Sequence, residues 1–207
     1  MTNFIEHIRT VKKINETDVN KFVSIFSYQK LKKNEILINS TQICDKVFYV
    51  EKGALRAYYI DENGIEKTRL ISLENQFCSN WASFHNLSQN CEIIESLEES
   101  IVYYATYYDF YSVVNSSFEL HKIYSLILEK FHTYQIKRFE FISNHCLQKR
   151  IEKIDIFFPK LKSRITNKVL ASFLHTTPEH CSYLKKRISK LTSILFISQQ
   201  ELLELIS

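Results

Sequence analysis

Apolar residues change their spacing along the chain, and each spacing predicts a different kind of element. Between residues 4 and 26 they recur at helical intervals with an interruption from Asn15 to Asp18, which predicts one or two short helices. From Tyr28 to about Tyr108 the apolar runs are short or alternate with polar residues, as in strands; they are LKKNEILI, KVFYVEK, ALRAYYI, TRLISL and SIVYYAT. The pattern therefore predicts an α+β protein with an antiparallel sandwich or β-roll.

Glycine is rare in this chain and falls between predicted strands. The two glycines are Gly53, in EKGAL, and Gly64, in DENGI. The Asn63-Gly64 pair separates two strand-like runs, residues 57–60 and 67–70. This dipeptide favours a type I′ turn because both residues tolerate positive φ, so we expect a β-hairpin there.

A long helix is predicted from Phe118 to Cys146, where helical spacing returns without any Gly or Pro. It carries two apolar stripes: Leu120, Ile123, Ile127, Phe131, Tyr134 and Phe141; and Ile136, Phe139, Ile142 and Cys146. Two stripes need two partners, which the β domain and the matching helix of a second subunit can supply. We therefore expect a homodimer, although the pattern does not establish which stripe forms its interface. We assign to that interface the residues Ile123, Ile127, Phe131, Tyr134 and Phe141. Burial of both stripes within one subunit is the alternative.

Residues Asn167 to Ile188 have the spacing of a helix-turn-helix. One apolar helical face is followed by a break at His175-Thr176-Thr177; its residues are Val169, Leu170, Phe173 and Leu174. Thr177 is a favourable N-cap, Pro178 suits the first helical position, and Glu179 suits the positive end of the helix dipole. The second helix would bury Cys181, Leu184 and Ile188. An ordinary helical hairpin with a basic, solvated face is the alternative interpretation.

Charge favours the DNA-binding interpretation of this segment. The whole chain has 27 Lys and Arg against 23 Asp and Glu, a modest net charge of +4. From Lys160 onward there are eight basic residues and three acidic ones, so the excess positive charge lies around the two-helix unit. A concentration of cations of this kind suits binding to phosphates.

Composition excludes several other classes of protein. No apolar run is long enough to span a membrane, and the N-terminus lacks the core of a signal peptide, so we expect a cytoplasmic protein. Five scattered cysteines without a CxxC pair give little support to a zinc site, a disulfide framework or a cysteine-ligated iron–sulfur cluster. His85 near Cys78 and Cys91 could suggest a metal site, but the HxH pair of such rolls is absent. The carboxylates of Glu92, Glu95, Glu98 and Glu99 are expected on a solvated edge. No metal, no cofactor and no enzyme activity are predicted.

The order of roll, long helix and helix-turn-helix resembles the cyclic-AMP receptor / fumarate-nitrate regulator (CRP/FNR) family of transcription factors. KVFYVEKGALRAYYIDENGIEKTRL is similar to the family's paired roll strands, and VLASFLHTTPEHCSYLKKRI is similar to its DNA-reading unit. The resemblance implies an N-terminal cyclic-nucleotide-binding-like β-roll (a double-stranded β-helix) over residues 1–117, a dimerisation helix over 118–146 and a DNA-binding domain over 147–207. A short strand at Ser193 to Ile197 and a terminal helix at Gln199 to Ile206 would form a reduced wing. Such a homodimer would set two helices into successive major grooves about 34 Å apart.

The sequence departs from the family where cyclic-nucleotide-binding members hold the ligand. Those members present a Gly-Glu pair and then an Arg-Ser or Arg-Thr pair, in which the arginine neutralises the cyclic phosphate. In the corresponding stretch, Asn75 to Ile94, Ser79-Asn80 and Asn90-Cys91 stand instead, and no arginine occurs. A buried phosphate without a cation is costly, so we expect that cyclic AMP is not the effector.

The helix-turn-helix departs from the family as well, with His175 in place of a turn glycine and Tyr183 in place of a guanine-reading arginine. The residues expected at DNA are Lys168, Thr177, Glu179, His180, Ser182, Tyr183, Lys185, Lys186 and Arg187. Among these, His180, Ser182 and Tyr183 are the candidates for base contacts, and the lysines and Arg187 for phosphate contacts.

The sequence therefore predicts a sequence-specific transcriptional regulator. Its expected partners are a palindromic double-stranded DNA operator, a second copy of the chain, RNA polymerase and an unidentified small-molecule effector, without a membrane. The alternative is a sensor that binds a small molecule or a protein and whose helix-turn-helix is vestigial.

Overall fold

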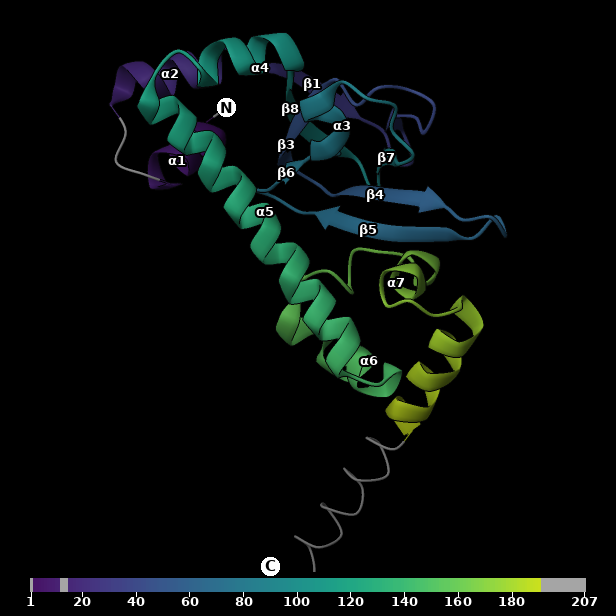
Figure 1. Ribbon diagram of the computed structural model, residues 1–207. Helices are drawn as coiled ribbons and strands as arrows, with labels where there is room; N and C mark the ends of the chain where they lie inside the picture. The colour runs from purple at the N-terminus through teal and green to yellow at the C-terminus, as the bar shows by residue number, and fades with distance from the viewer. Residues whose placement is uncertain (1, 12–14, 191–207) are drawn as a thin grey trace, which may run out of the picture. The chain divides into compact units, whose positions relative to one another are not determined.

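The computed structural model describes residues 2–11 and 15–190, shown in Figure 1. The chain separates into two compact units, Met1–Ile136 and Lys137–Ser207. The boundary lies inside the long helix α5 (Phe118–Asn144), rather than at either end of that helix. The long helix is therefore not a domain of its own, because its first part packs with the roll and its last part with the C-terminal helices.

Two helices precede the strands, as the apolar spacing predicts. They are α1 (Thr2–Val11) and α2 (Glu16–Ser24). The Asn15 side chain accepts a hydrogen bond from the backbone N–H of Asp18, which caps the first turn of α2. Two acidic residues, Glu16 and Asp18, favour the positive end of the same helix.

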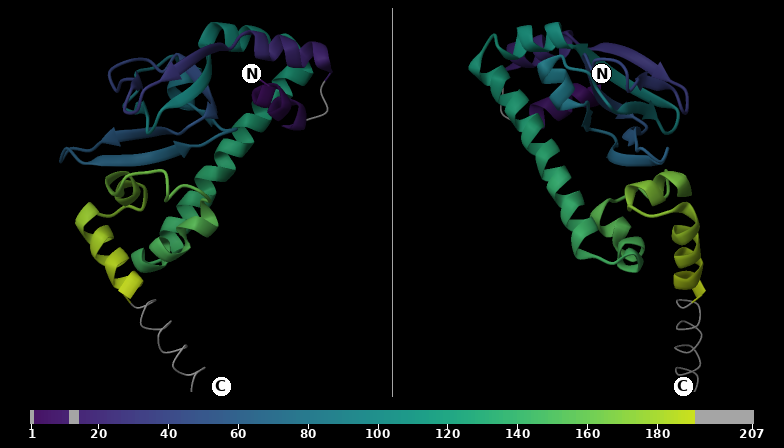
Figure 2. Two further views of the ribbon diagram at one scale, coloured as in Figure 1. Left: turned by 180° about the vertical axis from the view of Figure 1, so that it is seen from behind. Right: turned by 45° about the vertical axis from the view of Figure 1, so that its right-hand side comes forward.

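Eight strands form two antiparallel four-stranded sheets, seen from two further directions in Figure 2. One sheet has the order β1-β8-β3-β6: Ser27–Leu31, Ser100–Thr106, Lys46–Lys52 and Phe77–Cys78. The other has the order β2-β7-β4-β5: Ile36–Ile38, Ile93–Ser96, Leu55–Ile60 and Glu66–Ser72. Aliphatic residues from both sheets share one core, including Ile38, Val50, Leu55, Leu70, Ile94 and Val102. The predicted antiparallel roll is confirmed.

Both glycines lie in turns at positive φ, where a side chain is disfavoured. The hairpin predicted at Asn63-Gly64 joins β4 to β5, but its turn is not type I′. Only Gly64 of that pair has a positive φ, of 75°. The backbone N–H of Gly64 donates to the carbonyl of Asp61 over 2.9 Å, and the Asp61 side chain accepts from the N–H groups of Asn63 and Ile65. Asp61 thus selects a three-residue loop with glycine at the left-handed position.

A second core, rich in aromatic residues, lies between the roll and the helices around it. Helices α1, α2, α4 (Tyr107–Val114) and the first turns of α5 meet the β3 and β8 side of the roll. Ile123 and Ile127 of α5 are buried in this core, and Phe131 packs against it. The Tyr134 hydroxyl donates to the carbonyl of Ile71 over 3.2 Å. Together with α3 (Trp81–Asn86), these elements complete the N-terminal unit.

The expected dimer interface therefore needs a correction. Ile123 and Ile127 are covered by the roll of the same chain, and Phe131 and Tyr134 also pack on it. Phe141 is fully buried beside Phe157, with ring centroids 4.7 Å apart. Since the chain's own cores occupy this stripe, a second subunit has to meet another face of α5.

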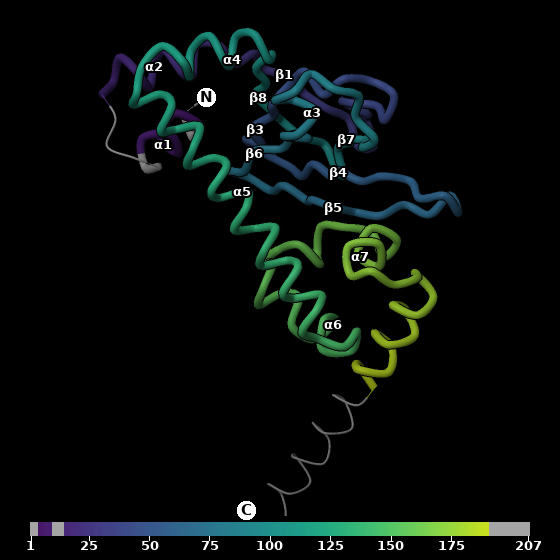
Figure 3. The backbone as a smooth tube through the Cα atoms, in the orientation of Figure 1, coloured from purple at the N-terminus to yellow at the C-terminus, as the bar shows by residue number. Residues whose placement is uncertain are grey.

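The C-terminal unit is helical throughout its described residues. After α5 come α6 (Leu147–Phe157) and α7 (Asn167–Phe173), as Figure 3 traces, and a further helix follows over residues 178–190. Phe141, Phe158 and Phe173 bring α5, α6 and α7 together in one core. The expected strand and terminal helix of the wing, Ser193 to Ile206, lie outside the described residues.

Candidate nucleic-acid interface

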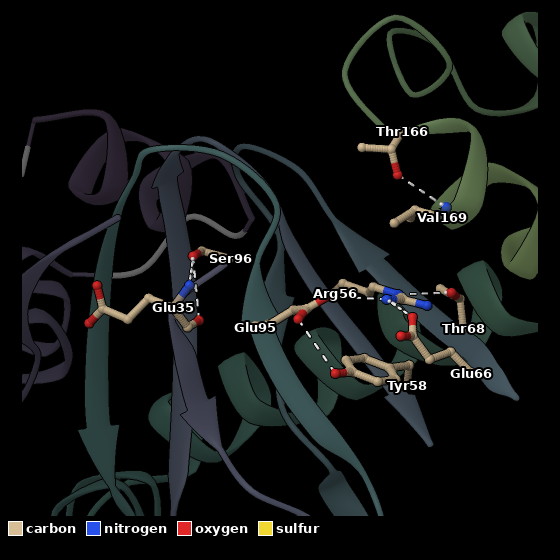
Figure 4. Close-up of polar contacts among 9 residues, drawn as sticks. All are labelled: Glu35, Arg56, Tyr58, Glu66, Thr68, Glu95, Ser96, Thr166 and Val169. Carbon is tan, nitrogen blue, oxygen red and sulfur yellow. Dashed lines mark hydrogen bonds and ion pairs between the residues drawn. The ribbon is translucent and has the colours of Figure 1, made fainter. Parts of the chain in front are cut away.

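The first helix of the helix-turn-helix, α7, is a short buried helix. It starts at Thr166, whose side chain accepts a hydrogen bond from the Val169 N–H over 3.3 Å (Figure 4). Its apolar face is buried as predicted: Val169, Leu170, Phe173 and Leu174. Ala171 is fully buried too, where the expected close approach of a second helix leaves no room for a larger side chain. Lys168 is exposed on the outer side of α7.

The turn after α7 is a Schellman motif with histidine at the left-handed position. The Thr176 N–H donates to the Ala171 carbonyl over 3.0 Å, and the His175 N–H donates to the Ser172 carbonyl over 3.3 Å. His175 has a φ of 57°. This position is usually glycine, because a Cβ is strained there, and histidine is among the residues that tolerate it better.

The second helix, residues 178–190, begins and faces as predicted. The Thr177 hydroxyl accepts a hydrogen bond from the His180 N–H over 3.3 Å, so it caps the helix. Cys181 and Leu184 are buried on its inner side. The exposed side chains are Thr177, Glu179, His180, Tyr183, Lys186, Arg187 and Lys190. Tyr183, at the centre of this face, keeps 61% of its surface exposed.

Asn167 joins the two helices, and the sequence pattern did not reveal this role. Its Nδ2 donates to the Ser182 hydroxyl over 2.8 Å and to the Pro178 carbonyl over 3.1 Å. Its Oδ1 accepts from Lys185 Nζ over 3.0 Å. Ser182 and Lys185, both expected at DNA, thus have partners inside the chain and are half-buried. Their polar groups orient the second helix, while those of Tyr183 and its neighbours face outward.

The stretch that corresponds to the ligand cassette is closed by its own side chains. Asn80 Nδ2 donates to Asn90 Oδ1 over 2.7 Å, and Asn80 also caps α3. Asn90 is buried and holds the backbone N–H of Glu92 over 2.9 Å. The Ser79 hydroxyl donates to the Lys46 carbonyl over 3.0 Å. Cys91 is exposed, so it does not take part in this closure.

Two arginines on neighbouring strands hold carboxylates that were expected in solvent. Arg69 of β5 makes a two-pronged ion pair with Glu92 and donates to the Ser79 carbonyl over 3.2 Å. Arg56 of β4 donates to Glu66 over 2.8 Å and to Glu95 over 3.1 Å, with Thr68 and Tyr58 beside it (Figure 4). Burial and the nearby carboxylates raise the pKa of Tyr58 to about 12. The expectation of a solvated edge is wrong for Glu92 and Glu95, since their cations come from other strands.

Solved structures share this arrangement of roll, long helix and helix-turn-helix. The c-di-GMP-responsive global regulator CLP of Xanthomonas campestris has a TM-score of 0.69 at 12% identity, over 85% of this chain and 92% of its own. FixK2 of Bradyrhizobium japonicum has a TM-score of 0.66 at 11% identity, over 81% of this chain and 86% of its own. A CRP/FNR-family transcriptional regulator of Thermus thermophilus has a TM-score of 0.62 at 14% identity, over 79% of this chain and 86% of its own. The chain has the CRP/FNR fold. No family model and no curated protein sequence matches it.

Nothing in the described part of this CRP/FNR fold suggests enzyme chemistry. Within residues 2–11 and 15–190 no group of three or more His, Cys, Asp or Glu side chains could hold a metal ion. His85 is instead hydrogen-bonded to the Tyr111 hydroxyl over 2.8 Å. Burial raises the pKa of Cys44 and raises that of Cys78 to about 12, so both thiols are protonated and poor nucleophiles at neutral pH. No helix of the described residues is long and apolar enough to cross a membrane.

Proposed function

We propose that this protein is a sequence-specific DNA-binding transcriptional regulator that acts as a homodimer. The observation that carries the proposal is the outer face of helix 178–190, where Tyr183, Lys186 and Arg187 are exposed beside a buried, capped first helix. The fold supports it, because the solved structures quoted above are regulators.

The exposed side chains divide the work at DNA by their chemistry. The major groove is about 12 Å wide and admits one helix, so the side chains at the centre of the inserted face meet base edges. Tyr183 and His180 have that position. Lys186, Arg187 and, from α7, Lys168 are longer cations that can reach phosphates on either side.

Selection of binding sites from random duplex DNA tests this proposal. The wild-type chain should enrich a palindrome with half-sites about one helical turn apart. The double variant Lys186→Ala/Arg187→Ala should bind more weakly, and the salt dependence of its binding should fall by about two phosphate contacts. The control is Lys32→Ala/Lys33→Ala, which removes the same charge from an exposed turn of the roll and should leave the palindrome and the affinity intact. Binding to no sequence, or binding equal in both double variants, would favour the sensor with a vestigial helix-turn-helix.

The proposed dimer uses an exposed seam of α5 and the residues just after it. His132, Ile136, Phe139, Ser143 and Cys146 follow one another at intervals of four and three residues, and all five are exposed. This is the spacing of a two-stranded coiled coil, in which such residues meet their counterparts from the partner helix. Phe139 has 71% of its surface exposed, which is unusual for a phenylalanine in a monomer.

Two equally exposed phenylalanines of α5 provide a matched test of the seam. Phe139→Asp should convert the dimer to monomer in analytical ultracentrifugation, because a carboxylate in the seam would face its own copy across the two-fold axis. Phe118 is 72% exposed but lies at the start of the same helix, outside the seam. Phe118→Asp should stay dimeric, and an acidic residue in the first helical turn is favourable. Equal behaviour of the two variants would contradict this interface.

We further propose that cyclic AMP is not the effector. The arginine nearest the cassette, Arg69, is committed to Glu92, and Asn80 to Asn90. A cyclic phosphate would have to displace a carboxylate that is covalently part of the chain. Isothermal calorimetry with cyclic AMP should show no binding at micromolar concentrations; heat of binding in that range would refute this part of the proposal.

A further inference from the structure

Two arginines from other helices hold the turn of the helix-turn-helix. Arg138 of α5 donates through Nη2 to the Phe173 carbonyl over 2.9 Å and to His175 Nε2 over 3.1 Å. Arg150 of α6 donates through Nη1 to the Leu174 carbonyl over 2.7 Å. The carbonyls at the end of a helix are the negative pole of its dipole, so both cations are favourably placed.

The contact between Arg138 and His175 determines the state of the imidazole. A guanidinium has donors and no acceptor, so His175 Nε2 must accept the hydrogen bond. The imidazole is therefore neutral and carries its proton on Nδ1. The guanidinium also lies over the Phe173 ring, 4.7 Å from the ring centroid, so the core fixes its place.

The same contact gives a reason for histidine at a strained position. Glycine would adopt the φ of 57° without strain, but it would leave Arg138 without the second acceptor on the turn. The turn leads directly into helix 178–190, so a side chain that fixes the turn also fixes the direction of that helix.

We propose that Arg138 positions the DNA-reading helix through the neutral imidazole of His175, and that protonation of this imidazole at mildly acidic pH releases the turn and weakens DNA binding. The inference rests on the proposed function and adds its regulation by pH. The charged groups facing the turn are Arg138 from α5 and Arg150 from α6; the next helix begins with Glu179 and His180, both exposed. An imidazolium has no lone pair at Nε2 and adds a cation beside two others. Arg138 would then have to withdraw.

Three variants separate positioning from plain stability. Arg138→Met removes the clamp, and we expect DNA affinity to fall roughly tenfold, the usual weight of one hydrogen bond to a charged group. His175→Gly removes the acceptor and also relieves the backbone strain. It should therefore lower affinity by a similar factor while the thermal midpoint stays the same or rises. His175→Asn tolerates the left-handed conformation and keeps an acceptor, so its affinity at neutral pH should stay within about threefold of wild type.

The pH profile is the second readout, since asparagine does not titrate. Between about pH 7.5 and about pH 5.5, which bracket the ordinary pKa of histidine, the wild-type chain should lose roughly another tenfold in affinity. His175→Asn should not lose it. Both proteins are compared in a His180→Gln background as well, because His180 is a second histidine, exposed on the DNA-facing side.

Two results would overturn the clamp: wild-type affinity in His175→Gly and Arg138→Met, or the same pH profile in wild type and His175→Asn. Amide hydrogen exchange of helix 178–190 gives a readout without DNA, and it should be faster at acidic pH in wild type than in His175→Asn. A wild-type chain that binds no DNA but shows this exchange pattern would contradict the proposed function and leave the clamp supported. Identical exchange in the two proteins would contradict the clamp alone.

Discussion

Gly53, in the turn between β3 and β4, should be among the least replaceable residues of the roll. Its φ is 100°, and a Cβ at this position would lie 2.2 Å from Ser100 Oγ, 2.6 Å from Ser100 Cβ and 2.8 Å from Ser100 Cα. The last of these atoms belongs to the backbone of β8, which is hydrogen-bonded to both β1 and β3 and cannot move aside for the methyl group.

Three costs add up for Gly53→Ala. Backbone strain at this φ costs about 1–3 kcal/mol, and forcing a methyl group into a packed site costs about 1–3 kcal/mol. The Ser100 hydroxyl also accepts a hydrogen bond from the Ala54 N–H over 3.2 Å, and displacing it loses about 1 kcal/mol. We expect a loss of roughly 4 kcal/mol in the free energy of unfolding.

Gly64→Ala is the matched control, because Gly64 also has a positive φ but nothing lies within 4 Å of its Cβ position. It should cost only about 1 kcal/mol of backbone strain. Urea unfolding followed by tryptophan fluorescence measures both values, because the single tryptophan, Trp81, is buried in the roll. Losses within about 1 kcal/mol of each other would refute the argument from close approach.

Three further predictions concern buried polar groups. Glu92→Ala should destabilise the roll by about 2–3 kcal/mol in the same unfolding assay, below the range for fully buried pairs because Arg69 keeps 24% of its side chain exposed; a second change, Arg69→Met, should restore part of the loss, and no restoration would mean that the pair is not coupled. Asn167→Ala should lower the thermal midpoint and DNA affinity together, whereas Asn167→Asp should lose less because it keeps its acceptor for Lys185; equal loss in both would contradict the bridging role. Cys78 should resist a thiol reagent at about pH 8 while the two exposed cysteines react at once, and rapid reaction of Cys78 would contradict its raised pKa.

The helix-turn-helix was predictable because its signals are local. Thr177 and Pro178 mark the helix start within two residues, and Cys181 and Leu184 mark the buried face at helical spacing. The strands between residues 36 and 106 were predictable for the same reason. Short elements such as β6, β7 and α3 were not assigned, because two to six residues carry too little periodicity to distinguish a strand from a loop.

Long-range partners were the part that spacing could not reveal. The two stripes of α5 are equally apolar, so their spacing cannot tell which one the roll covers; Ile123 is buried there and Phe139 is exposed. Glu92 stands among three other glutamates and looks solvated until Arg69, 23 residues away in the chain, is placed beside it. Asn167 looks like an ordinary first-turn residue until helix 178–190 is folded against it.

Both departures from the CRP/FNR pattern that the sequence showed turn out to have internal partners. Where the family pattern has a turn glycine, His175 supplies an acceptor to Arg138. Where a ligand phosphate would meet an arginine, Glu92 meets Arg69. In each case a group that could stand alone in other chains is replaced by a pair that depends on a second residue. A substitution that looks like the loss of a motif residue is therefore better judged with its spatial partner, because a double variant tests the pair and a single one exposes the orphan.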